Sequence, residues 1–201
     1  MDIYEILKTH NRPWSVREII FFAIVLLVTS VLFTILVKKK KVTLLQAVSA
    51  FMLLVFLGIV FASTVFSRMP EGRRYELELF WSWKEALGIG SSNPLQQADF
   101  LEEIILNIIL LMPAGFLLPF VCNRPLRWTA GLTEGLLLSG CIEGLQLLLG
   151  RGLFEFDDIL HNSIGCMTGC MIAGFTDFVE SREPIAADSL VLQTTEEPPH
   201  E

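Results

Sequence analysis

The chain has 201 residues, of which 52% are hydrophobic and only 18% are charged, and its formal net charge is -7. Soluble domains usually carry about 25% charged residues, so the composition excludes an ordinary soluble domain. The acidic balance excludes a nucleic-acid-binding protein, because such proteins are basic. The apolar residues also gather in long runs, which indicates an integral membrane protein.

Long apolar runs predict an all-α fold, a polytopic membrane helix bundle of about five transmembrane helices. The runs cover residues 19–37, 42–66, 104–121, 129–149 and 159–179. Each is long enough to cross a hydrocarbon core of about 30 Å at a rise of ~1.5 Å per residue. The chain then divides into an N-terminal segment with a two-helix hairpin (1–66), an extracytoplasmic aromatic-rich loop (67–103), a three-helix region (104–180) and an acidic tail (181–201).

Basic residues in the short loops predict the orientation. Four lysines, residues 38–41, separate the first two runs, and Arg124 with Arg127 lies between the third and fourth. With five spans, both loops fall on the same side, which the positive-inside rule places in the cytoplasm. We therefore expect a multi-pass protein of the plasma membrane with its N-terminus outside and a disordered tail inside. Several cations in the opposite loop run against the rule: Arg68, Arg73, Arg74 and Lys84.

The outer loop contains a group of aromatic and aliphatic residues. From Tyr75 to Lys84, hydrophobic and polar residues alternate, and only Phe80 breaks the pattern. Alternation with period two predicts an extended segment. Two interpretations remain open: an interfacial belt at the lipid headgroups, or a surface for an amphiphilic ligand.

Polar residues in and beside the last three runs predict a pocket that opens to the outer leaflet. Glu143 and Gln146 are three residues apart, so they share a helix face, whereas Glu134 lies on the opposite face and outside the group. Ionisable groups within the membrane are costly and are functional candidates. The predicted pocket consists of Asn107, Glu143, Gln146, Arg151, Asp157, Asp158 and Asn162.

A purely structural role for the same residues is the alternative. Asp157 and Asp158 precede the fifth run and could cap that helix, and Arg151 could pair with Glu143 or Asp158 as a buried lock. No residue is assigned a catalytic role, and no metal site or cofactor is expected. The four cysteines are expected to pack as small apolar residues, and they are Cys122, Cys141, Cys166 and Cys170.

Pairs of glycines four residues apart predict close helix packing, and Pro113 predicts a kink in the third helix. Small residues at this spacing allow helix backbones to approach each other, so we expect the fourth and fifth helices to pack tightly. The pairs are Gly131 with Gly135, Gly140 with Gly144, and Gly165 with Gly169.

Three stretches carry a resemblance to a known family. They are LNIILLMPAGFLLP at 106–119, IEGLQLLLGRGLFEFDD at 142–158 and ILHNSIGCMTG at 159–169. In order and spacing they resemble the VanZ-like family, which shows Asn before an apolar run into Pro-x-Gly, then Glu-x-x-Gln, Arg, an acidic pair, Asn and Gly. The resemblance covers about residues 101–175. Leu111 and Ala114 depart mildly from the pattern.

The resemblance implies a non-enzymatic membrane protein of the cell envelope. The founding member is associated with resistance to the lipoglycopeptide teicoplanin, so the expected partners are membrane lipids and a lipid-linked or glycopeptide ligand, with no nucleic acid. One alternative is an intramembrane enzyme acting on a lipid-linked or glycan substrate, with Glu143 and Asp157 or Asp158 as acid and base. A small transporter is a third hypothesis, although the chain lacks an internal repeat. The sequence leaves the oligomeric state open.

Overall fold

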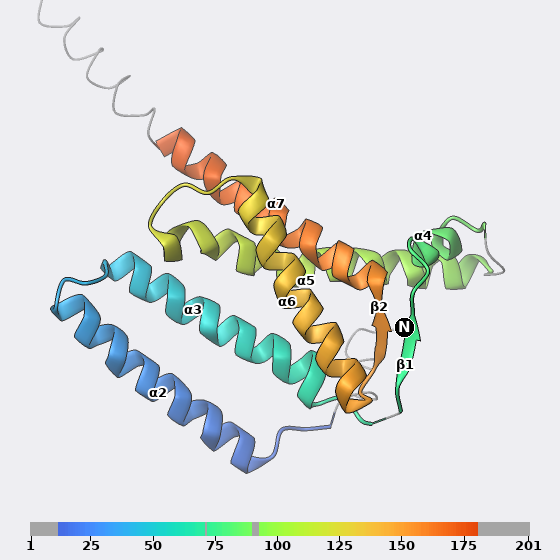
Figure 1. Ribbon diagram of the computed structural model, residues 1–201, viewed down its shortest axis with the longest axis horizontal. Coiled ribbons are helices and arrows are strands. Elements are labelled where there is room, and N and C mark those ends of the chain that lie inside the picture. Colours follow the sequence, from blue (N-terminus) through green and yellow to red (C-terminus); the bar gives the residue numbers. More distant parts are fainter. Residues whose placement is uncertain (1–11, 71, 90–92, 181–201) are drawn as a thin grey trace, which may run out of the picture.

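The computed structural model describes residues 12–70, 72–89 and 93–180. The chain folds into an elongated bundle of long helices with a small strand pair at one end (Figure 1). In chain order the elements are α2 (Val16–Lys38), α3 (Leu44–Phe61), the π-helix η1 (Ala62–Phe66), β1 (Arg74–Glu76), α4 (Trp81–Ala86), α5 (Pro94–Cys122), α6 (Trp128–Leu149), β2 (Leu153–Glu155) and α7 (Phe156–Glu180).

Four of these helices are long and apolar enough to cross a membrane: α2, α3 extended through η1, α5 and α6. The fold is therefore the all-α membrane bundle that the sequence predicts. The fifth predicted span, α7, is also a helix, of 25 residues. Within the described residues it is not apolar enough to count as a fifth membrane-spanning candidate. Its polar composition is tolerated because α7 packs against both α5 and α6, which shield it from lipid.

Local capping signals set several helix ends. Ser15 with Glu18 and Thr43 with Gln46 form capping boxes at the starts of α2 and α3, where side chains satisfy backbone N–H groups that have no helical partner. The sequence places the third helix ten residues too late, because Asn93 caps a helix that begins at Pro94. Polar residues dominate this first part of α5, so hydropathy alone could not find its start.

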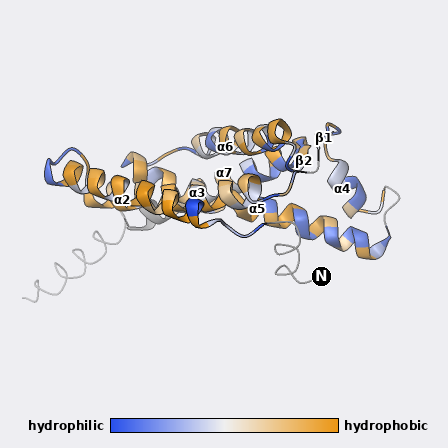
Figure 2. Cartoon of the chain, turned by 90° about the horizontal axis from the view of Figure 1, so that it is seen from below, coloured by the Kyte–Doolittle hydropathy of each residue, from blue (hydrophilic) through white to orange (hydrophobic). Residues whose placement is uncertain are grey.

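The two basic loops lie at the same end of the bundle. The hairpin between α2 and α3 and the connection between α5 and α6 both appear at the left of Figure 1. The Gln46 side chain donates a hydrogen bond to the Val121 carbonyl, which ties the two connections together. Figure 2 shows hydrophilic colours at the lysine hairpin and again at the opposite end, around α4 and the start of α5. An apolar middle between two polar ends is the arrangement that a bilayer requires.

Glycine contacts place α7 at the centre of the helix packing. A Cβ atom on Gly131 would lie 2.6 Å from Cys170 Cβ, and one on Gly135 would lie 2.6 Å from Ser163 Cα. The predicted close packing of α6 on α7 is therefore present. Gly165 and Gly169 face backbone atoms of α5 instead.

The Gly140 and Gly144 pair was predicted wrongly. A Cβ atom at either position would meet nothing within 4 Å, so this pair makes no close helix contact. The spacing of two small residues fixes a helix face but does not determine whether another helix lies against that face.

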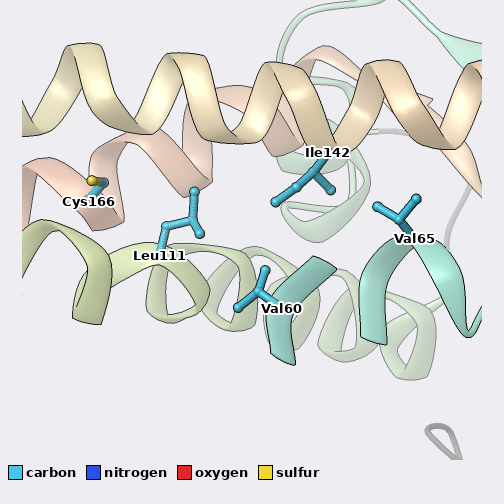
Figure 3. Close-up of a cluster of buried hydrophobic side chains, with 5 residues drawn as sticks. All are labelled: Val60, Val65, Leu111, Ile142 and Cys166. Atoms are coloured by element: carbon cyan, nitrogen blue, oxygen red, sulfur yellow. The ribbon is translucent and has the colours of Figure 1, made fainter. Parts of the chain in front are cut away.

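A small apolar core joins the central helices. Figure 3 shows Val60 of α3, Val65 of η1, Leu111 of α5, Ile142 of α6 and Cys166 of α7 converging between the ribbons. Cys166 and Cys170 are buried and free, as expected of packing residues, whereas Cys122 and Cys141 are free but exposed. Helix α5 remains helical through both Pro113 and Pro119.

The outer loop is more ordered than the alternation predicts. Only residues 74–76 are extended, as β1, which pairs in parallel with β2. Residues 81–86 form the helix α4, so the prediction of an extended segment to Lys84 is wrong there. The acidic tail after residue 180 lies outside the described residues.

Candidate functional site

A group of polar side chains gathers where α5, α6, α7 and η1 meet. Asn107 of α5 donates a hydrogen bond of 2.6 Å to Asp158 Oδ1 at the start of α7. One turn further along α7, Asn162 donates to Ser139 Oγ of α6 at 2.9 Å, and Ser139 donates to the Asp158 carbonyl at 3.4 Å. Three helices are thereby held in one network by contacts between residues 19 to 51 positions apart.

Two further residues of α6, Glu143 and Gln146, extend this network toward β2 and η1. Glu143 accepts a hydrogen bond of 3.1 Å from the backbone N–H of Glu155 in β2. Gln146 donates one of 3.1 Å to the carbonyl of Thr64 in η1. A π-helix leaves carbonyls without their usual helical partners, and Gln146 satisfies one of them. Glu143 and Gln146 are 2% and 3% exposed, so both need partners within the protein or from a ligand.

The cation of this site is Arg68, which sequence analysis did not select. Its positive charge acts on the carboxylates of Glu103, Glu143 and Asp158. A Cβ atom on Gly152 would lie 2.8 Å from Arg68 Nη1 and 3.2 Å from Gln146 Oε1, so both groups face the same glycine. The signal that could have found Arg68 is its breach of the positive-inside rule directly after an apolar run.

We call this group the acid–amide cluster. It consists of Arg68, Asn107, Ser139, Glu143, Gln146, Glu155, Asp158 and Asn162.

Glu155, like Arg68 and Ser139, is a member of the cluster that sequence analysis missed. It is 7% exposed and lies in β2, between the helices. Burial, together with the charges of Asp158, Glu103 and Glu143, raises the pKa of Glu155 to about 9. Like charges at close range favour the protonated form, and the hydrogen bond from the Trp81 side chain offsets only part of this rise. At neutral pH Glu155 is therefore largely uncharged.

Asp157 lies apart from the cluster and fixes α4. It is fully buried, and its carboxylate accepts hydrogen bonds from the backbone N–H of Phe80 at 2.6 Å, the backbone N–H of Ser82 at 3.1 Å and the Ser82 hydroxyl at 2.6 Å. The aspartate thus caps α4. With three donors on its two oxygens, this carboxylate is engaged in holding α4 and is not free to contact a substrate.

Arg151 makes none of the hydrogen bonds of the cluster. Its Nη1 donates a hydrogen bond of 2.6 Å to the Phe66 carbonyl, and it lines a cavity with residues of α2 and α3. Among the described residues no carboxylate lies within ion-pair distance of Arg151, so the expected lock with Glu143 or Asp158 does not form. The positive-φ glycines Gly150 and Gly152 on either side turn the chain at this point.

His161 of α7 is held by a hydrogen bond from α4. Trp83 Nε1 donates a hydrogen bond of 2.8 Å to His161 Nε2, which leaves the proton of a neutral imidazole on Nδ1. Because Nε2 is occupied, this nitrogen is not free to act as a base.

In the part of the chain that the structure describes, no group of His, Cys, Asp and Glu residues could hold a metal ion. Glu134 makes none of the contacts described above for the cluster.

Some buried polar atoms in this region have no hydrogen-bond partner. Two are acceptors within the cluster, Gln146 Oε1 and Asn162 Oδ1, and one is a donor on α7, His161 Nδ1. Buried polar groups normally have partners, and each unmet one costs about 1–3 kcal/mol. The region therefore offers both acceptors and a donor to a polar molecule.

These features define a class: a helical membrane protein with a polar cluster enclosed by its central helices. A family model described as VanZ/LLP1 matches residues 44–177. This range covers most of the chain and includes α3, which lies outside the stretches that carry the resemblance in the sequence. The chain belongs to the VanZ/LLP1 family. Comparison with curated proteins and with solved structures finds no match.

Proposed function

We propose that this protein acts in the plasma membrane to lower susceptibility to lipoglycopeptide antibiotics, by binding a hydroxyl-rich amphiphile at the acid–amide cluster. The observation that carries the proposal is the set of unpartnered buried atoms: the acceptors Gln146 Oε1 and Asn162 Oδ1 within the cluster, and the donor His161 Nδ1 on the neighbouring residue of α7. A hydroxyl group both donates and accepts hydrogen bonds. Sugar hydroxyls therefore suit both kinds of atom, whereas a phosphate offers only acceptors and an ammonium group only donors.

The apolar surroundings support an amphiphilic rather than a free polar ligand. The exposed faces of α5 and α6 carry large hydrophobic side chains such as Ile105, Ile109 and Leu137. A lipid chain can rest against such faces while its headgroup reaches the cluster. Under the predicted orientation, the cluster lies in the outer half of the membrane, where a lipoglycopeptide or a lipid-linked glycan would arrive.

The enzyme alternative lacks support at the residues it needs. It requires Asp157 or Asp158 as a partner for Glu143, and Asp157 is saturated by three hydrogen bonds from residues 80 and 82. Asp158 accepts a hydrogen bond from Asn107. The hydroxyl of the cluster, Ser139, donates to the Asp158 carbonyl and accepts from Asn162, so Glu143 does not activate it and binding is the function that these contacts favour.

The test compares Glu143→Gln with Glu134→Gln in a susceptible host exposed to teicoplanin. Both variants replace a carboxyl group on α6 by an amide, but only Glu143 belongs to the cluster. A typical hydrogen bond is worth about 0.5–1.5 kcal/mol, or about 2- to 12-fold in binding. We expect Glu143→Gln to lose most of the protection that the natural protein gives, measured as the minimal inhibitory concentration, and Glu134→Gln to keep it.

Membrane levels and thermal melts decide between binding and folding. Protection lost at unchanged level and melting temperature supports the proposal. Equal protection from natural protein and the Glu143→Gln variant, or no protection from the natural protein, contradicts it. A glycopeptide without an acyl chain serves as a second antibiotic, against which a weaker effect is expected.

A further inference from the structure

A cavity of about 630 Å³ lies between the start of α2 and the end of α3, and none of the cluster residues lines it. Its size falls within the range of about 300–1,000 Å³ typical of ligand pockets. The inner wall is aromatic, formed by Phe21 and Phe22 of α2 and Phe61 of α3. The Phe22 ring occupies the space that a side chain at position 58 would take, because a Cβ on Gly58 would collide with it.

Positive charge gathers in the lining of the same cavity. Arg12, Arg17 and Arg151 line it, and Glu18 is the one carboxylate among the lining residues, so three positive charges minus one leave an excess of two. Arg12 is paired with Glu18. Arg17 is exposed, and Arg151 uses one N–H to bind the Phe66 carbonyl. A guanidinium has five N–H donors, so Arg17 and Arg151 retain donors for an anion.

The position of the cavity suits a lipid headgroup. It lies at the end of α2 away from the lysine hairpin, beside Trp14, and indoles favour the headgroup level of a bilayer. None of the 23 residues of α2 is buried, so this helix depends on lipid to cover its sides. A chain entering between α2 and α3 would meet aromatic rings, while its headgroup would meet the arginines.

We infer that this cavity binds a phospholipid with a net negative headgroup, with one acyl chain against Phe21, Phe22 and Phe61 and the phosphate held by Arg17 and Arg151. Charge complementarity selects an anionic lipid over a zwitterionic one. The inference goes beyond the proposed function, because the cavity is separate from the acid–amide cluster and its lipid selectivity does not depend on any antibiotic phenotype.

The lipid site and the cluster nevertheless share η1. The Phe66 carbonyl accepts hydrogen bonds from Arg12 and Arg151 on the cavity side, and the Thr64 carbonyl accepts one from Gln146 on the cluster side. A lipid that holds Arg151 therefore stabilises the same π-helix that positions Gln146.

The test measures lipid binding to the full chain, purified in a non-ionic polyoxyethylene detergent, by native mass spectrometry. The probes are dioleoyl phosphatidylglycerol, dioleoyl phosphatidylcholine, dihexanoyl phosphatidylglycerol and inorganic phosphate. We expect the long-chain anionic lipid to bind most tightly. One arginine near an anionic lipid is worth about fivefold in affinity, so Arg17→Gln combined with Arg151→Gln should lower the preference for phosphatidylglycerol over phosphatidylcholine by about thirtyfold.

The matched control is Arg73→Gln, which removes a cation from the same end of the bundle but outside the cavity. It should leave the lipid preference unchanged. If the double variant does not fold, the single Arg17→Gln variant at an exposed position should still lower the preference by about fivefold. Equal binding of the two dioleoyl lipids, an unchanged preference in the arginine variants, an equal loss in Arg73→Gln, or binding of inorganic phosphate as tight as that of the lipid would overturn the inference.

Discussion

Asp157 shows how a single buried carboxylate can organise a segment far away in the chain. Its hydrogen bonds reach the backbone of Phe80 and Ser82, more than 70 residues earlier. Phe80 adopts a left-handed conformation, with φ of 63°, which is uncommon for a residue other than glycine and needs support from its surroundings. Asp157 provides this support, because it binds the Phe80 N–H directly.

We expect Asp157→Asn to destabilise the protein by about 1–3 kcal/mol, because an amide has one acceptor oxygen where three donors now share two. The change should lower the melting temperature in detergent by several degrees. Asp99→Asn, at an exposed position on α5, is the control and should melt like the natural protein. If the two variants melt alike, the cap on α4 contributes nothing measurable.

The pKa of Glu155 predicts how stability depends on pH. In the unfolded chain a glutamate has its ordinary pKa near 4.5, whereas in the folded protein the value is about 9. Between these values the folded state binds the extra proton, so stability falls as pH rises. We expect the melting temperature to decrease from about pH 5 to pH 9, and Glu155→Gln, which stays neutral, to flatten this decrease. A melting temperature that rises over this range, or the same slope in both proteins, would contradict the assignment.

At the scale of the helices, α7 packs so closely on α5 that two of its positions have no room for a side chain. Added Cβ atoms on Gly165 and Gly169 would collide with backbone carbonyl oxygens of Ile108 and Met112 in α5. Backbone atoms cannot rotate aside as the end of a flexible side chain can. The packing of α5 on α7 therefore depends on glycine at these positions.

We expect Gly165→Ala to destabilise the bundle by about 1–3 kcal/mol or more, because it overpacks a close interface. Gly144→Ala is the matched control, since its Cβ would meet nothing within 4 Å. In the control, alanine should be neutral or stabilising by up to about 1 kcal/mol, because of its higher helix propensity. The measurement is thermal unfolding in detergent, and equal melting temperatures for the two variants would show that α5 and α7 can separate without cost.

For the molecule as a whole, the orientation in the membrane remains a prediction. Cys122 is exposed at the end of the bundle with the basic loops, which we expect in the cytoplasm. Leu87 is 67% exposed at the opposite end, after α4. In a Leu87→Cys variant that also carries Cys141→Ser, a membrane-impermeant thiol reagent should label position 87 in intact cells and Cys122 only after permeabilisation. The reverse pattern would invert the topology.

The sequence by itself determined the class of fold and most of the cluster. Long apolar runs form helices because each helix satisfies its own backbone hydrogen bonds in lipid, so hydropathy finds them without knowledge of their neighbours. The common face of Glu143 and Gln146 follows from helix geometry alone. Motif order in the last three helices indicated the family that the comparison then showed.

Only the tertiary structure decided which cation joins the carboxylates and which residues cap the loop. Arg68 follows η1 and its charge acts on Glu143 and Asp158, whereas Arg151 is held by the Phe66 carbonyl. The helix α4 replaces a predicted extended segment because its cap, Asp157, comes from α7. Contacts of this kind join positions that are distant in the chain, so neither hydrophobic periodicity nor local propensity can reveal them; they depend on how the helices pack.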